Sequence, residues 1–328
     1  MWTCWWSHAS GLGASLACQI LRTPQQSSAK AAYLERINRA IDYVVGNLDR
    51  PLNLSEVAKV ACFSPFHFHR IFHSLVGEPL SQFVNRLRLE RALQILSHNP
   101  NRQLTGVALQ CGFSSSSDFS RRFKKRYGVP PSVFDINAFR AQRRGDLQTS
   151  GAQHGARLER LPVGENPDGF EVELRSLPAR TVAYVRVLES YREGAVAAAA
   201  ARLFSWATAR DLADGQWLGY MWDDPELVAL KHCRYDVAVV VDQVTPEGEI
   251  GRFDFPAMTI AQVVVRGGID VEMRAIDWLF GTWLPPSAYV PDSNPCFEAW
   301  FGRPFAHGMA HFELAIQLPV MPAPPLDH

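Results

Sequence analysis

Two matching stretches of sequence decide the fold of the first half of the chain. Leu54-Ser-Glu-Val57-Ala58 returns 50 residues later as Leu104-Thr-Gly-Val107-Ala108, and Phe63-Ser64 returns as Phe113-Ser114. Each copy has apolar residues at helical spacing, followed by a serine that can cap the next helix, Ser64 in the first copy and Ser114 or Ser115 in the second. Each copy therefore predicts a short helix, a tight turn and a second helix, which is a helix-turn-helix unit.

A longer helix is predicted between the two units, opening at Pro79 and running to about Ser97. Its buried stripe would be Leu80, Phe83, Val84 and Leu87. A continuous helix of that length would hold the two units apart as one rigid body.

The outward faces of the second helices carry the residues predicted to contact a partner. In the first unit they are Phe66, His67, His69 and Arg70, and in the second Ser116, Ser117, Asp118, Ser120, Arg121, Lys124 and Lys125. Two such helices about 34 Å apart fit successive major grooves of DNA. We expect Arg70 and Arg121 to face guanines and the lysines to face phosphates. The alternative is that these residues form only a solvated helical face.

The charge distribution supports a polyanionic partner for this half alone. The whole chain has 33 basic and 33 acidic residues, but residues 31–145 have 17 against 8, a net of +9. Residues 146–328 have 14 against 25, a net of −11, and Arg22 and Lys30 supply the remaining +2. Such an asymmetry indicates that the first half binds nucleic acid.

The first half resembles the DNA-binding domain of the AraC/XylS family of bacterial transcription regulators. The similar segments are Phe68-His-Arg-Ile-Phe72, Arg86-Leu-Arg-Leu-Glu-Arg-Ala92, Cys111-Gly-Phe113, Phe119-Ser-Arg-Arg-Phe123 and Gly128-Val-Pro-Pro131. The resemblance implies a double helix-turn-helix domain, which we place at residues 31–140.

The remaining segments predict little chemistry of their own. Residues 1–30 are expected to be a poorly ordered extension, 141–169 a polar linker and 321–328 a tail. The six cysteines are scattered, and the histidines at 67, 69 and 73 do not share a helical face, so no metal site or disulfide is predicted. No apolar stretch reaches the roughly 20 residues that span a bilayer, and we expect a cytoplasmic protein without membrane contact.

The second half contains its own repeat, with the period of strands. Leu177–Val187 is echoed by Phe255–Val265 at an offset of 78, and Tyr235–Val239 by Phe312–Ile316 at an offset of 77. Each copy predicts two strands, a helix and two strands. We expect an α+β domain over residues 170–320 with pseudo-twofold symmetry and a ligand cleft between the copies.

Glu298 is the candidate for the chemistry of that cleft. It is the only carboxylate between Ser293 and Ala310, and aromatic residues surround it in sequence. A carboxylate in such a setting has a partner, a raised pKa or a cationic ligand. The alternatives are a salt bridge to Arg303 or an exposed strand residue.

Residues 170–320 also resemble the GyrI-like domain, a small-molecule-binding module of multidrug-responsive regulators. The similar segments are Asp223-Asp-Pro225, Cys233-Arg-Tyr-Asp236, Trp283-Leu-Pro285 and Pro295-Cys-Phe-Glu298. The resemblance implies that Glu298 binds a cationic or amphipathic ligand. The residues expected to line its pocket are Tyr184, Tyr220, Trp222, Trp283, Glu298 and Trp300.

The combined prediction is a ligand-responsive transcription regulator that binds double-stranded DNA and a small-molecule effector, and that contacts RNA polymerase. No cofactor and no enzymatic activity are expected. One alternative is a GyrI-like hydrolase that pairs Glu298 with the hydroxyl of Tyr220 or Tyr184 as acid and base. Another is an adaptor whose acidic half binds a protein.

Overall fold

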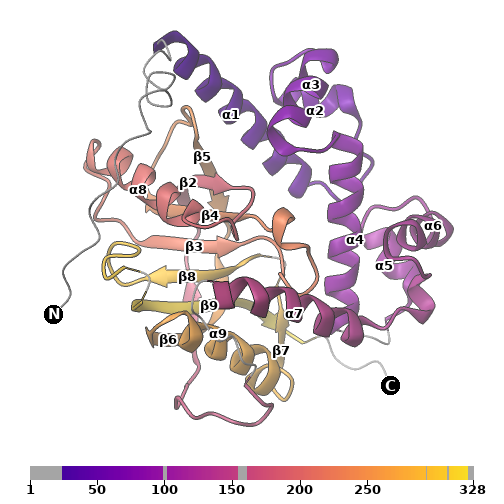
Figure 1. The fold of residues 1–328 in the computed structure, drawn as a ribbon, viewed down its shortest axis with the longest axis vertical. Coiled ribbons are helices and arrows are strands. Elements are labelled where there is room, and N and C mark those ends of the chain that lie inside the picture. Colours follow the sequence, from indigo (N-terminus) through magenta and orange to yellow (C-terminus); the bar gives the residue numbers. More distant parts are fainter. Residues whose placement is uncertain (1–23, 99–101, 154–160, 293, 309, 324–328) are drawn as a thin grey trace, which may run out of the picture.

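The computed structural model describes residues 24–98, 102–153, 161–292, 294–308 and 310–323. In this part of the chain an all-helical region precedes a mixed region built on one antiparallel sheet (Figure 1). The predicted order, a double helix-turn-helix domain followed by an α+β domain, is confirmed. The helices of the first region are α1 (Pro24–Val45), α2 (Leu54–Val60), α3 (Pro65–Val76), α4 (Leu80–His98), α5 (Leu104–Gln110), α6 (Ser116–Tyr127) and α7 (Ile136–Gln153), with a 3-10 turn η1 (Pro131–Val133).

The two helix-turn-helix units, α2–α3 and α5–α6, begin and end where their sequences place caps. The Ser64 side chain accepts from the backbone N–H of His67 at the start of α3, and Ser115 accepts from that of Asp118 at the start of α6. Both second helices end at a glycine with positive φ, Gly77 (83°) and Gly128 (84°). Glycine adopts this left-handed conformation without strain because it has no side chain. Helix α4 joins the units as expected.

The expected ends and linker differ from the structure in two places. Helix α1 begins at Pro24, so residues 24–30 continue a helix, and only residues 1–23 of the expected extension lie outside the described residues. Helix α7 occupies the first part of the expected linker, because its helix-forming Ala, Gln and Arg residues have a surface to pack on. There Phe139 packs against Tyr127, with ring centroids 5.6 Å apart.

The sheet contains both copies of the second repeat. The first copy comprises β1 (Glu173–Leu177), β2 (Arg180–Val187), α8 (Ala195–Thr208), β3 (Trp217–Met221) and β4 (Tyr235–Val241). The second comprises β5 (Ile250–Phe255), β6 (Met258–Gly267), α9 (Ile269–Trp278), a π-helical turn η3 (Leu279–Trp283), β8 (Cys296–Trp300) and β9 (Phe312–Pro322). A 3-10 turn η2 (Leu230–His232) precedes β4, and β7 (Tyr289–Pro291) pairs with β9.

The strand order reveals the pseudo-twofold relation. It runs β1-β6-β9-β8-β3-β4-β2-β5. Replacing each strand by its equivalent in the other copy and reading the order backwards gives the same order. The axis passes between β3 and β8, where Gly219 lies opposite Glu298. The predicted repeat and its junction are therefore confirmed, and Glu298 lies at that junction.

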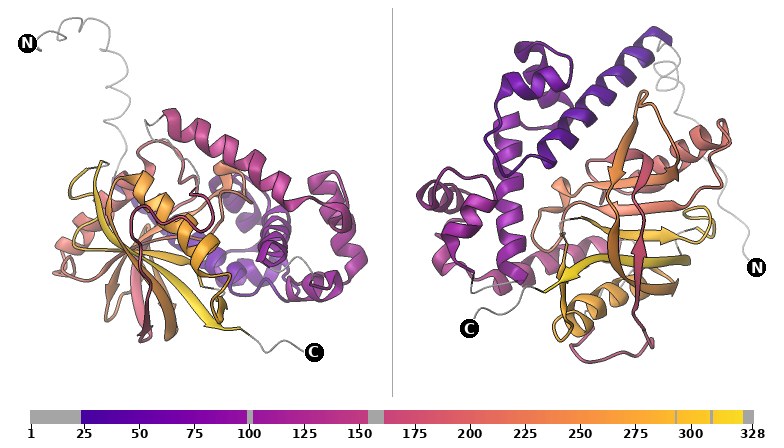
Figure 2. Two further views of the ribbon diagram at one scale, coloured as in Figure 1. Left: turned by 90° about the horizontal axis from the view of Figure 1, so that it is seen from below. Right: turned by 180° about the vertical axis from the view of Figure 1, so that it is seen from behind.

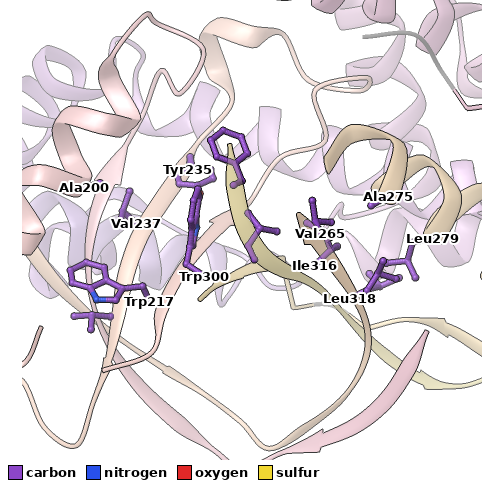
Figure 3. Close-up of a cluster of buried hydrophobic side chains, with 14 of the residues drawn as sticks. Ala200, Trp217, Tyr235, Val237, Val265, Ala275, Leu279, Trp300, Ile316 and Leu318 are labelled. Carbon is purple, nitrogen blue, oxygen red and sulfur yellow. The ribbon is translucent and has the colours of Figure 1, made fainter. Parts of the chain in front are cut away.

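Each face of the sheet buries its own apolar cluster. On one face α8 and α9 cover Val185, Trp217, Val237, Trp300 and Ile316, part of which Figure 3 shows. On the opposite face Tyr184, Tyr220, Phe255 and Phe297 form a second cluster; in the view from behind, the edge strands β1 and β5 cross steeply in front of the others (Figure 2, right). We call these the helix face and the open face.

Candidate functional site

The predicted DNA-contacting residues occupy the outer sides of α3 and α6. Phe66, His67, His69 and Arg70 are exposed, and so are Ser117, Arg121, Lys124 and Lys125, while Ser116, Asp118 and Ser120 are half-buried. The inward phenylalanines at 68, 72, 119 and 123 are fully buried and hold each helix on its unit. Both helices project away from the sheet, with α4 between them (Figure 1).

The two second helices present their arginines differently. Arg121 donates to Asp118 at 2.7 Å, and Arg122 donates to the same carboxylate at 2.8 Å, which lowers the pKa of Asp118. The guanidinium of Arg70 instead lies 5.8 Å from the ring centroid of Phe66, which is 67% exposed. No ion pair among the described residues includes Arg70. Arg70 is therefore more available than Arg121 to hydrogen-bond to a DNA base.

This difference leads to a first prediction. Arg70→Ala should cost about 1–3 kcal/mol of affinity at one base pair, whereas Lys125→Ala should weaken all sequences about equally. The measurement is competition binding against a panel of single-base variants of a selected site. Equal losses on the selected site and on random DNA in Arg70→Ala would show that Arg70 does not contact a base.

The helix face brings Glu298 together with two residues that the sequence analysis missed. The hydroxyl of Tyr235 on β4 donates to Glu298 Oε2 at 2.5 Å, and the Glu272 side chain on α9 hydrogen-bonds to Glu298 as well. Trp300 hydrogen-bonds to the same carboxyl group, and its ring lies beside Tyr235 (Figure 3). Two carboxyl groups in direct contact must share a proton or a cation.

Burial determines the electrostatics of this cluster. Burial raises the pKa of Glu298, and burial together with the neighbouring Glu298 raises the pKa of Glu272 well above its usual range. Among the described residues no arginine or lysine forms an ion pair with either carboxyl group. Gly219 leaves room for this arrangement, because a Cβ there would lie 1.7 Å from the Tyr235 hydroxyl and 2.8 Å from Glu298 Oε2. The alternative of a salt bridge between Glu298 and Arg303 is not found, since the Arg303 guanidinium lies 4.0 Å from the Phe204 ring centroid.

The expectation of a single pocket is wrong, because the sheet separates its six residues. Trp283, Glu298 and Trp300 belong to the helix face, where Trp283 stacks on Tyr289. Tyr184, Tyr220 and Trp222 belong to the open face. The pairing of Gly219 with Glu298 sets Tyr220 opposite Phe297, so the Tyr220 ring points away from Glu298. The acid–base pair of Glu298 with Tyr220 or Tyr184 is excluded for the same reason.

Tyr184 and Trp222 take part in a buried contact between the two regions. Arg186 on β2 forms ion pairs with Asp236 at 2.7 Å and with Asp42 of α1 at 2.8 Å. The Tyr184 hydroxyl donates to Asp42 at 2.5 Å, and the Trp222 indole N–H donates to Asp236 at 2.7 Å. The side chain of Arg186 is 2% exposed and Asp236 is fully buried, whereas the side chain of Asp42 is 20% exposed, so the contact is buried on the sheet side and partly open on the α1 side.

A second contact joins the sheet region to α4, α6 and α7. Arg234 donates twice to Asp223, at 2.8 and 2.7 Å, and Glu90 of α4 lies among their charges, with its pKa raised to about 7 by burial. Leu227 and Val228 pack into the core of the second helix-turn-helix unit. Arg140 of α7 donates to Glu226 at 2.9 Å. The sheet region is thus docked on both halves of the helical region.

The described part of the chain contains neither a candidate membrane span nor a candidate metal site. No helix there is long and apolar enough to span a membrane. No group of three His, Cys, Asp or Glu side chains is placed to hold a metal ion.

Comparison with known proteins follows the same division. Residues 57–135 match a helix-turn-helix domain family, and residues 170–321 match the GyrI-like small molecule binding domain family. The HTH-type transcriptional activator AarP of Providencia stuartii is 31% identical over 101 residues, which are 31% of this chain and 74% of AarP. The probable transcriptional regulator LumQ of Photobacterium leiognathi is 32% identical over 37% of this chain and 49% of its own length.

Two solved structures are also similar to parts of this chain. An AraC-type transcriptional regulator from Chromobacterium violaceum is similar over 30% of this chain and 86% of its own, at 27% identity and a TM-score of 0.28. The EcmrR C-terminal domain is similar over 47% of this chain and 99% of its own, at 18% identity and a TM-score of 0.36. This chain belongs to the AraC-type helix-turn-helix transcription regulators, and it combines that DNA-binding domain with a GyrI-like small-molecule-binding domain.

Proposed function

We propose that this regulator responds to an organic cation bound beside Glu298 and Glu272. The observation that carries the proposal is the contact between two carboxyl groups, that of buried Glu272 and that of half-buried Glu298, without a cationic partner among the described residues. Ionising either group in isolation is costly in an apolar setting, and a ligand cation offsets that cost. The rings of Tyr235 and Trp300 add cation–π attraction of about 0.5–2 kcal/mol each.

Strand β4 is the route by which such a ligand influences the DNA-binding domain. Three consecutive residues at its start have different partners. Tyr235 hydrogen-bonds to Glu298. The preceding residue, Arg234, pairs with Asp223 next to Glu90 of α4. The following residue, Asp236, pairs with Arg186, which also pairs with Asp42 of α1. A ligand that displaces the Tyr235 hydroxyl therefore moves the residue between both domain contacts.

The docked arrangement limits how regulation can act. The outer faces of α3 and α6 stay exposed while the sheet region is docked, so this region does not cover the DNA-reading residues. A ligand would instead change the relative placement of the two helix-turn-helix units, which must enter successive grooves together. The contact through α1 lies beside the first unit, and the contact through the C-terminal part of α4 lies beside the second. The two contacts are therefore suited to change the relative placement of the units.

The test is DNA binding of the full chain with and without benzyltrimethylammonium, measured by fluorescence anisotropy on a site selected from random DNA. Neopentylbenzene, which has the same shape without the charge, is the matched control. We expect the cation to change DNA affinity, and by linkage DNA should change cation affinity by the same factor. A cation that binds without any change in DNA affinity would contradict a ligand response.

We further propose that the DNA-bound chain acts on RNA polymerase, in a cytoplasmic setting. Support comes from the relative AarP, which is named a transcriptional activator. The chain spans 74% of the length of AarP but only 49% of the length of LumQ.

A further inference from the structure

The open face contains a buried positive charge that lacks a counter-charge. Arg180 opens β2, and its guanidinium lies 4.5 Å from the ring centroid of Phe297 and 5.9 Å from that of Phe255. Its Nε and Nη2 are buried without a hydrogen-bond partner, and no ion pair in the described ranges includes it. Burial lowers the pKa of Arg180 to about 10, so the group remains charged at neutral pH.

A third unpaired donor lies beside this guanidinium. Tyr220 is fully buried, its hydroxyl has no hydrogen-bond partner among the described residues, and it is the titratable neighbour of Arg180. The Tyr220 ring contacts the same two phenylalanines, at 5.3 Å from Phe255 and 5.6 Å from Phe297. The Nε and Nη2 groups of Arg180 and the hydroxyl of Tyr220 therefore lie against aromatic rings and have no acceptor among the described residues.

We propose that Arg180 and Tyr220 form a second ligand site, which takes the carboxylate of an aromatic acid. A carboxylate offers only acceptors, and its two oxygens match the fork of a guanidinium. Leaving buried donors unpaired costs free energy that such a ligand restores. The neighbouring rings of Phe255 and Phe297 suit the planar apolar body of the acid.

The site is separate from the one at Glu298, although the two are adjacent in sequence. Phe297 and Glu298 are consecutive on β8, so their side chains lie on opposite faces of the sheet. Arg180 lies at the start of its strand and is half-buried as a residue, although its Nε and Nη2 atoms are buried. Strand β8 thus separates the proposed site for an organic anion on one face of the sheet from the proposed site for an organic cation on the other.

The experiment is equilibrium dialysis of the full chain against 2-naphthoate, with 2-naphthamide as the uncharged comparison. We expect saturable binding of the acid and much weaker binding of the amide. Arg180→Met keeps an apolar side chain on Phe297 and should weaken 2-naphthoate roughly tenfold to a hundredfold, the usual effect of losing charge-assisted hydrogen bonds. Tyr220→Phe should weaken it by a smaller factor.

Three controls separate this site from other effects. Arg252→Met removes an exposed arginine of β5 that already pairs with Asp254, and should leave affinity unchanged. Glu298→Gln should also bind 2-naphthoate normally, whatever its effect on cations. Should Arg180→Met fail to fold, Arg180→Lys and the acid–amide comparison in the wild type still decide. Absence of saturable binding, equal affinity for acid and amide, or unchanged affinity in folded Arg180→Met would overturn the proposal.

Discussion

Glu298→Gln should weaken binding of benzyltrimethylammonium by about 2–5 kcal/mol, the effect of removing one partner of a buried charge pair. The substitution keeps the size of the side chain and its contact with Tyr235. It should leave DNA binding of the ligand-free chain nearly intact, because Glu298 touches neither α3 nor α6. Isothermal titration of cation and of neopentylbenzene into both proteins provides the measurement.

The pH dependence gives the same prediction a second readout. Because the pKa of Glu298 and that of Glu272 are both raised, the ligand-free pair holds a proton that a cation displaces. Cation affinity should therefore rise as pH rises through the raised pKa, with proton release. A carboxyl group whose pKa is raised by folding stabilises the fold below the ordinary carboxyl pKa, and that contribution is lost as pH rises. A bound cation should reduce this loss of stability, because it stabilises the ionised carboxyl groups.

Glu173→Gln, an exposed change on β1, is the matched control for both readouts. Equal cation affinity in wild type and Glu298→Gln, at every pH tested, would place the ligand elsewhere. Normal cation binding with the DNA response lost would show that Glu298 couples the domains without binding the ligand.

Arg186→Met should lower the free energy of unfolding by about 3–5 kcal/mol, because it leaves two buried carboxylates without their shared cation. Burial already raises the pKa of Asp42, and Arg186 is the largest influence opposing that rise. Denaturant unfolding of the full chain measures the loss. The unfolding of the two regions should also separate into two transitions, since this contact joins α1 to the sheet.

The control for this substitution is Arg202→Met, which removes an exposed ion pair to Glu249. Exposed pairs contribute about 0–1 kcal/mol, so this variant should unfold almost as the wild type does. A loss in Arg186→Met no larger than in Arg202→Met would mean that the buried contact contributes little to docking.

The sequence predicted the helical half in most of its detail, because its information is local. The caps at Ser64 and Ser115 and the buried phenylalanines follow from spacing within one unit. The exposure of Phe66 and Arg70 follows from the same periodicity. The pairing of Arg121 with Asp118 is equally local, at i and i+3, and could have been anticipated.

The effector site was predicted only in part, because it depends on register between distant strands. Alternation along a strand is enough to place Tyr220 with Trp222, and Glu298 with Trp300, on common faces. Which pair faces the helices depends on Gly219 lying opposite Glu298, and a shift of one residue reverses the answer. Glu272 did carry a signal, since it shares the buried stripe of α9 with Ala275 and Leu279.

The mirrored strand order has a consequence for how this domain can be divided. The first strand of each repeat pairs with the second strand of the other, β1 with β6 and β5 with β2. Each repeat therefore completes its neighbour's sheet edge and cannot form its full set of strand pairs alone. Cleavage of the loop between β4 and β5 would leave two fragments that are each incomplete but complementary. Mixed in solution, such fragments should reassemble by exchanging their first strands.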